Sequence, residues 1–199
     1  WAELVTDDDI VIIAGDISWG LKLDEAMADL EWIHELPGQK VLLRGNHDLW
    51  WCRIQHLRTL YDDMHFLQND CYYLEELDLA ICGSRGWPTP DAATYTEHDE
   101  KMYLREQGRL RNSLVEAKKK GASRIITAMH YPPAKVEETE FTRIMQEYGV
   151  TQCVYGHLHG MVAWTNGIKG EHGGIDYKLV SLDYLGARPK LIYDSEQEM

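Results

Sequence analysis

Four short motifs carry side chains that suit a divalent metal ion, and each lies at or just past a short apolar run. The motifs are Ala14-Gly15-Asp16, Gly45-Asn46-His47-Asp48, Met129-His130-Tyr131 and Gly156-His157-Leu158-His159. Apolar runs rich in β-branched residues are typical of buried strands. Functional groups in open α/β sheets collect beyond the carboxyl ends of the strands, so the four motifs can converge in space.

The tetrad at residues 45–48 is more specific than a lone Gly-Asp. Asn46 offers a carbonyl oxygen to a metal ion, His47 can donate a proton near neutral pH, and Asp48 can orient the imidazole. The alternative is that Asn46 and Asp48 only form a turn and cap a helix that begins at Trp50. Capping does not explain the histidine between them, so the tetrad favours chemistry.

Histidines complete the candidate set. His130 precedes two prolines that stiffen its loop. His157 and His159 alternate, and alternating side chains of an extended segment point to opposite sides. The pair therefore suits a turn, or two ions about 3.5–4 Å apart. The alternatives are a surface loop for the two histidines and a capping role for Asp16.

The elements that must position these motifs alternate between strands and helices. Strands are expected at residues 10–13, 41–43, 125–128 and 152–155, and helices at 23–36, 50–60, 96–120 and 138–148. Three short runs within 64–81 predict a β-meander. Further strands are expected at 161–164, 175–180 and 190–193. This order predicts an α/β fold of two sheets packed face to face with helices outside.

Composition restricts the classes of function. The 33 acidic and 20 basic side chains give a net charge of −13, which repels nucleic-acid backbones and anionic lipid. A metal site supplies local positive charge, so a small phosphorylated substrate can still bind. Without a long apolar segment or signal peptide, we expect a cytoplasmic protein that makes no membrane contact. The four cysteines have no Cys-x-x-Cys spacing and are expected to be reduced core residues.

The order Gly-Asp, Gly-Asn-His-Asp, His and Gly-His-x-His, from Gly15 to His159, resembles the calcineurin-like metallophosphoesterases. The resemblance implies a four-layer α/β/β/α sandwich. It also implies hydrolysis of a small phosphomonoester or phosphodiester by a water molecule that two divalent ions activate. Oxygen and nitrogen donors without thiolates favour manganese or iron, with zinc or nickel as alternatives.

The resemblance also assigns roles to individual residues. Asp16 would bridge the two ions and His159 would bind the first. His47 would protonate or stabilise the leaving group, and Asp48 would orient His47. The ligands implied for the second ion, besides Asp16, are Asn46, His130 and His157.

One motif of that family, an Asp-x-His well upstream of Gly-Asp, is absent. Only 15 residues precede Asp16, and none is histidine. Asp16 and His159 alone are too few for a tight first site. Because the downstream motifs are intact and the chain starts at Trp1, we expect residues 1–199 to be a single metallophosphoesterase domain that lacks its N-terminal strand and first metal-binding motif.

Two other classes of function remain alternatives. A one-metal or inactive relative could serve as a scaffold for a protein partner, which the missing motif favours. A nuclease is disfavoured by the acidic composition and the lack of a basic stripe. Substrate choice is expected to depend on loop residues 84–103, where Arg85, Trp87 and Tyr95 can contact a ligand. Trp19 is the other tryptophan whose loop can line a cleft. Substrate identity and oligomeric state stay open.

Overall fold

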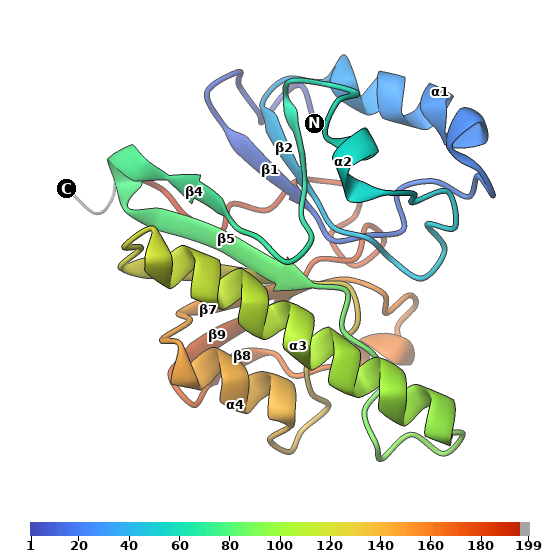
Figure 1. The fold of residues 1–199 in the computed structure, drawn as a ribbon, viewed down its shortest axis with the longest axis vertical. Helices are drawn as coiled ribbons and strands as arrows, with labels where there is room; N and C mark the ends of the chain where they lie inside the picture. Colours follow the sequence, from blue (N-terminus) through green and yellow to red (C-terminus); the bar gives the residue numbers. More distant parts are fainter. Residues whose placement is uncertain (196–199) are drawn as a thin grey trace.

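The structure is a computed structural model that describes residues 1–195, and it contains two β-sheets with helices outside (Figure 1). The smaller sheet is parallel and consists of β1 (Ile10–Ile13), β2 (Gln39–Leu42) and β3 (Met64–Phe66). The larger sheet is mixed, in the order β4-β5-β6-β7-β9-β8. Its strands are β4 (Tyr72–Leu74), β5 (Leu79–Ser84), β6 (Arg124–Met129), β7 (Gln152–Tyr155), β8 (Gly170–His172) and β9 (Ile175–Leu179). The predicted α/β fold is confirmed.

Alternation along β2 shows how the layers form. Val41 and Leu43 pack in the core between the two sheets, where they meet Ile81 and Val154. Leu42 points to the opposite face and joins the core beneath the helices. A strand that is buried on both faces has a continuous run of apolar residues in its sequence. The apolar runs predicted as strands could therefore be recognised.

Helices cover the outer face of each sheet (Figure 1). The smaller sheet is covered by α1 (Leu23–His34) and α2 (Ile54–Leu57), and the larger by α3 (Glu97–Lys119) and α4 (Glu140–Glu147). Thr96 begins α3 with a capping box, in which the Thr96 hydroxyl accepts from the Asp99 N–H while the Asp99 carboxylate accepts from the Thr96 N–H.

The prediction of a helix at residues 50–60 is wrong over most of that range, because only Ile54–Leu57 is α-helical. Trp50 and Trp51 instead pack as buried side chains in the core under the smaller sheet. The Trp50 indole N–H donates to the Asp48 carboxylate over 3.0 Å. Burial of both rings and this hydrogen bond hold the segment in a turn.

The predicted meander is confirmed for its second pair of strands and wrong for its first strand. β3 lies parallel to β2 in the smaller sheet, whereas β4 pairs antiparallel with β5 in the larger one. The chain therefore crosses from one sheet to the other between Phe66 and Tyr72. Asp70 supports the crossing, since it accepts from Arg58 and its side chain also accepts from the Gln68 N–H.

The tail differs from the expected three strands. Residues 161–164 were predicted as a strand, but Ala163–Asn166 is a short 3-10 helix. Residues 190–193 form no strand. The strand predicted at 175–180 is present as β9 and forms a hairpin with β8, which was not predicted. Gly173 and Gly174 both have positive φ, as a two-residue turn of type I′ requires.

Two composition-based expectations can be compared with the structure. All four cysteines are unpaired, and three are buried, but Cys52 is exposed, so it is not the core residue expected. Within residues 1–195, no helix combines the length and apolar character needed to cross a bilayer.

Candidate metal centre

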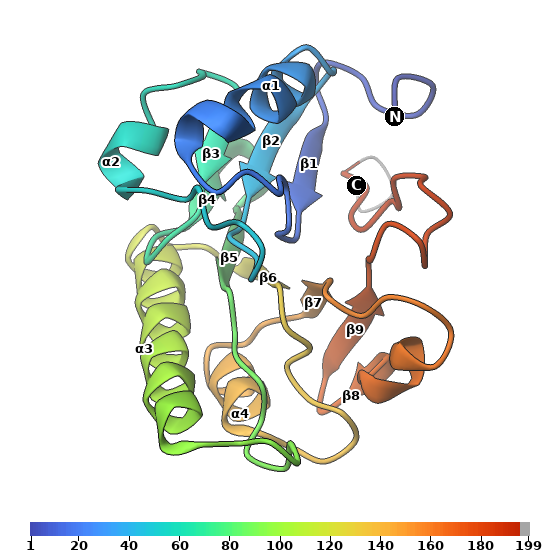
Figure 2. The same ribbon diagram turned by 90° about the vertical axis from the view of Figure 1, so that its right-hand side faces the viewer.

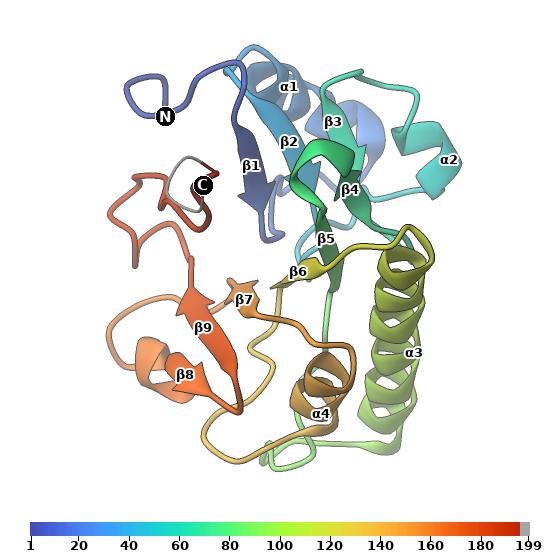
Figure 3. The same cartoon turned by 90° about the vertical axis from the view of Figure 1, so that its left-hand side faces the viewer.

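The loops that follow β1, β2, β6 and β7 meet where the two sheets lie together (Figures 2 and 3). His130, after β6, has its Nδ1 2.9 Å from the carbonyl oxygen of Ala14, after β1. Its Nε2 lies 2.6 Å from Oδ1 of Asn46, after β2. These contacts join the larger sheet to the smaller one at the strand ends, where the four motifs were expected.

Four of the five predicted ligands lie together. Asn46 Oδ1 is also 2.9 Å from His157 Nδ1, and the facing nitrogens of His157 and His130 are 3.1 Å apart. Asp16 Oδ2 is 3.5 Å from His130 Nε2. The candidate ligand atoms of Asp16, His130 and His157 all lie within 4.8 Å of one another. One carboxylate, one amide and two imidazoles therefore surround one point.

The protonation states of the two histidines suit this cluster to a cation. Because the Ala14 carbonyl can only accept, His130 Nδ1 carries the proton and Nε2 of the neutral ring presents a lone pair. Burial lowers the pKa of His130, and burial followed by the charge of His130 lowers the pKa of His157 to about 4. Both rings are then neutral at pH 7. The His130 Nε2 lone pair faces Asn46 Oδ1 and lies 3.5 Å from the Asp16 carboxylate, and a cation between them would relieve this repulsion, so the residues fit a divalent ion.

The backbone is strained where it presents two of these ligands. Asp16 has φ 56° and His157 has φ 68°, in the left-handed region that costs non-glycine residues roughly 1–2 kcal/mol. Such strain clusters at functional sites. The approach of the loops also requires glycine at residue 45, because a Cβ there would lie 2.1 Å from Asp16 Oδ1.

Asp48 holds the two loops together instead of orienting His47. Its carboxylate is wholly buried, and no hydrogen bond joins it to the His47 ring within residues 1–195. Five N–H groups donate to it at 2.7–3.1 Å: the backbone amides of Asp16, Ile17, Ser18 and Gly45 and the indole of Trp50. The sequence-based role of Asp48 is therefore revised to positioning the loop that carries Asp16.

Replacing Asp48 with asparagine is expected to destabilise the protein by roughly 3 kcal/mol, because an amide removes the charge and turns an NH2 group toward buried donors. Urea unfolding measures this loss. Asp62→Asn is the matched control, since Asp62 is exposed. A loss below about 1 kcal/mol, the scale of one ordinary hydrogen bond, would show that Asp48 does not hold these loops.

His47 lies outside the donor cluster. Its side chain is exposed and stacks on Trp19, with ring centroids 4.2 Å apart and planes at 25°. Its backbone N–H donates to Asp16 Oδ1 over 2.8 Å, which ties it to the centre. Within residues 1–195 its ring makes no hydrogen bond, so both nitrogens can meet a ligand.

His159 also lies outside the cluster. It is not part of the group formed by Asp16, His130 and His157, and its Nδ1 lies 3.0 Å from Asp183 Oδ1. Asp183 was not singled out in the sequence. It follows β9, which lies parallel to β7, so its loop emerges at the same edge of the sheet. The available signal was an aspartate soon after an apolar strand.

A cavity of about 410 Å³ lies beside His157. The Tyr131 ring forms part of its wall, 4.2 Å from the His157 ring. Other lining residues are Pro88, Thr89, Asp91, Ala92, Ala93, Pro132, Ala134, Lys135, Leu158 and Asn166. Residues of loop 84–103 line part of this cavity, whereas Tyr95 packs against Tyr103 and donates to Glu100.

Mixed oxygen and nitrogen donors at the strand ends of an α/β sandwich define a candidate metal centre of the phosphoesterase type. The chain matches the calcineurin-like phosphoesterase family over residues 2–161 and belongs to that family. No curated protein matches it.

Proposed function

We propose that the protein is a metal-dependent hydrolase of small phosphomonoesters or phosphodiesters. The observation that carries this proposal is the convergence of Asp16, Asn46, His130 and His157 in a phosphoesterase family member. When bound, divalent ions supply Lewis-acid charge for phosphoryl oxygens and an activated water. We propose two ions, manganese or iron in preference to zinc or nickel, with His159 as a ligand of the first.

The chain's own residues would support the reaction in distinct ways. Asp16 and Asn46 present oxygen donors, and His130 and His157 present neutral nitrogens that need not lose a proton before binding a metal ion. His47, exposed at the rim, can give a proton to the departing ester oxygen.

The substrate is proposed to be a small phosphorylated molecule. The cavity beside His157 falls within the roughly 300–1,000 Å³ typical of small-ligand sites. Its Tyr131 wall offers an aromatic surface to the organic part of the ester. The net charge of −13 disfavours long nucleic acid and anionic membranes as partners.

Hydrolysis of p-nitrophenyl phosphate and bis(p-nitrophenyl) phosphate tests this proposal. After treatment with a chelator, activity on at least one ester is expected to return with Mn²⁺. Asp16→Asn is the control, because it removes a charged ligand while keeping the size of the side chain. If neither manganese, iron, zinc nor nickel gives turnover above Asp16→Asn, the hydrolase proposal is wrong. That outcome would favour a one-metal or inactive scaffold, which the position of His159 outside the group of Asp16, His130 and His157 also supports.

A further inference from the structure

Four arginines gather near the carboxyl ends of β2 and β5 and on α3: Arg44, Arg85, Arg105 and Arg109. The wholly buried Glu106 accepts from Arg105 over 3.1 Å and from Arg109 over 3.0 Å. Within residues 1–195, Arg44 and Arg85 have no carboxylate at ion-pair distance, although the Arg44 Nε donates to the backbone carbonyl of Asp48 over 3.2 Å. In a chain of net charge −13, this is an unusual local excess of positive charge.

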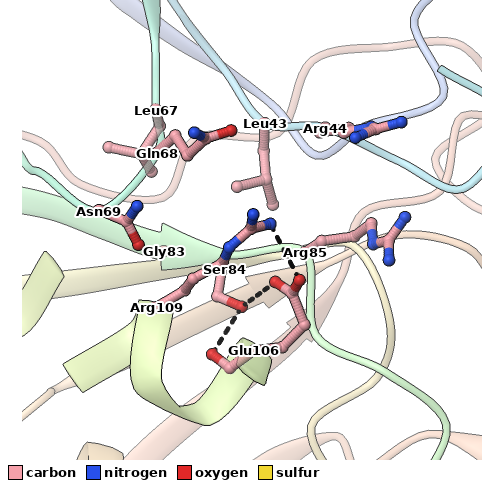
Figure 4. A pocket seen from close by; sticks show the side chains of 10 residues that line it. All are labelled: Leu43, Arg44, Leu67, Gln68, Asn69, Gly83, Ser84, Arg85, Glu106 and Arg109. Carbon is pink, nitrogen blue, oxygen red and sulfur yellow. Dashed lines mark hydrogen bonds and ion pairs between the residues drawn. The ribbon is translucent and has the colours of Figure 1, made fainter. Parts of the chain in front are cut away.

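The guanidinium groups of Arg44 and Arg85 face the same way. In Figure 4 those of Arg44 and Arg85 extend to one side, away from Glu106, while that of Arg109 turns toward Glu106. The cavity between these side chains measures only about 20 Å³, enough for about one water molecule, so a larger anion would meet the projecting ends of the Arg44 and Arg85 guanidinium groups and would not enter this cavity. The Arg85 Nε is buried and has no hydrogen-bond partner within residues 1–195. A buried donor of this kind is destabilising unless a ligand satisfies it.

Both arginines adjoin the metal centre. Arg44 lies two residues before Asn46, and the carbonyl oxygen of Arg85 accepts the backbone N–H of His130 over 3.2 Å. The Arg85 guanidinium lies 4.5 Å from the centre of the Trp87 ring. Trp87 lies 5.8 Å from Tyr131 in the wall of the substrate cavity. Side-chain contacts therefore connect Arg85, through Trp87 and Tyr131, to the candidate metal ligand His157.

We propose that Arg44 and Arg85 form a subsite that binds a second phosphoryl group of the substrate, several bonds from the ester that is cleaved. A planar guanidinium donates two parallel N–H groups to an oxyanion, and such a pair discriminates phosphate from neutral groups. The inference rests on the proposed function and narrows its substrate class to compounds with a further phosphoryl group.

Binding of inorganic pyrophosphate to the metal-free protein tests the subsite without catalysis. Calorimetry is expected to show affinity that falls roughly 10- to 100-fold in Arg85→Gln, the scale of a lost charge-assisted hydrogen bond. Arg85→Lys keeps the charge but not the planar fork, so its affinity should be intermediate. Arg143→Gln is the matched control, because Arg143 is exposed and pairs with Glu138. The Arg85 guanidinium donates no hydrogen bond within residues 1–195, so Arg85→Gln should fold, which circular dichroism checks.

Kinetics with manganese then test the substrate class, using fructose 6-phosphate and fructose 1,6-bisphosphate as probes. The parent should prefer the bisphosphate by about tenfold or more in kcat/KM, mainly through KM. In Arg85→Gln this ratio should fall toward one, whereas Arg143→Gln should keep it.

The outcomes separate this inference from the proposed function. Equal pyrophosphate affinity in the parent and Arg85→Gln overturns the subsite. Binding that depends on Arg85 without preference for the bisphosphate overturns the substrate assignment and indicates a site for free phosphate. Binding that depends on Arg85, combined with no hydrolysis of either sugar phosphate or of the nitrophenyl esters, overturns the proposed function and leaves the anion subsite standing.

Discussion

Replacing His157 with alanine is expected to release the metal ion and reduce phosphoester hydrolysis to background. His157 Nδ1 lies within 3.1 Å of both Asn46 Oδ1 and His130 Nε2, so its loss opens one side of the cluster. Removing a residue that only supports a ligand costs roughly 10- to 100-fold in metal affinity. Removing the ligand itself should exceed 100-fold.

Metal content after dialysis against manganese, measured by elemental mass spectrometry, tests this expectation together with kcat. His56→Ala is the matched control, because His56 is an exposed histidine on α2, away from the cluster. Equal manganese content in the parent and His157→Ala would show that the cluster is not the metal site. Lost activity with retained manganese would instead give His157 a role in the reaction but not in binding.

The candidate centre was recognisable in the sequence because each ligand follows a buried strand. Asp16, Asn46, His130 and His157 come from four strands whose carboxyl ends meet, and strand periodicity alone located those ends. The direction of each side chain was not recognisable. It depends on single backbone angles, such as the left-handed φ of His157.

Contacts between segments far apart in the chain could not be predicted from the sequence. The pairing of His159 with Asp183 spans 24 residues, and no local pattern encodes it. β3 looks like the first strand of a meander from its turn residues, yet Met64 and Phe66 pack in the core of the other sheet. Asp48 could cap a helix or orient His47 by its position alone. Only the folded loops show which N–H groups reach it.

Arg44, which we propose as part of an anion subsite, was not singled out in the sequence for a different reason. It lies between an apolar strand and the Gly-Asn-His-Asp tetrad. A basic residue at that position indicates only that the end of the strand is exposed to solvent. Its significance depends on Arg85, which follows a strand of the other sheet. Arginines that come together from two different sheets follow no periodic pattern in the sequence, so the sequence does not reveal the cluster.

Replacing His47 with alanine is expected to lower kcat roughly 10²- to 10⁴-fold, the usual contribution of a general acid, while metal content stays near that of the parent. The imidazole makes no hydrogen bond within residues 1–195, and it lies outside the group of Asp16, His130 and His157. Its backbone N–H, which survives the substitution, still donates to Asp16. Loss of manganese in His47→Ala would identify this residue as a ligand and contradict the assignment.

The dependence on leaving group gives the sharper test. An acid that protonates the departing oxygen matters least for esters with acidic leaving groups, so His47→Ala should impair hydrolysis of p-nitrophenyl phosphate less than that of phenyl phosphate. Because Trp19 stacks on the His47 ring, Trp19→Ala should show part of the same difference between the two esters. Trp19→Phe keeps an aromatic face, so its activity on both esters should return toward that of the parent. Equal losses on both esters in His47→Ala would mean that the ring binds the phosphoryl group and does not donate a proton to the leaving oxygen.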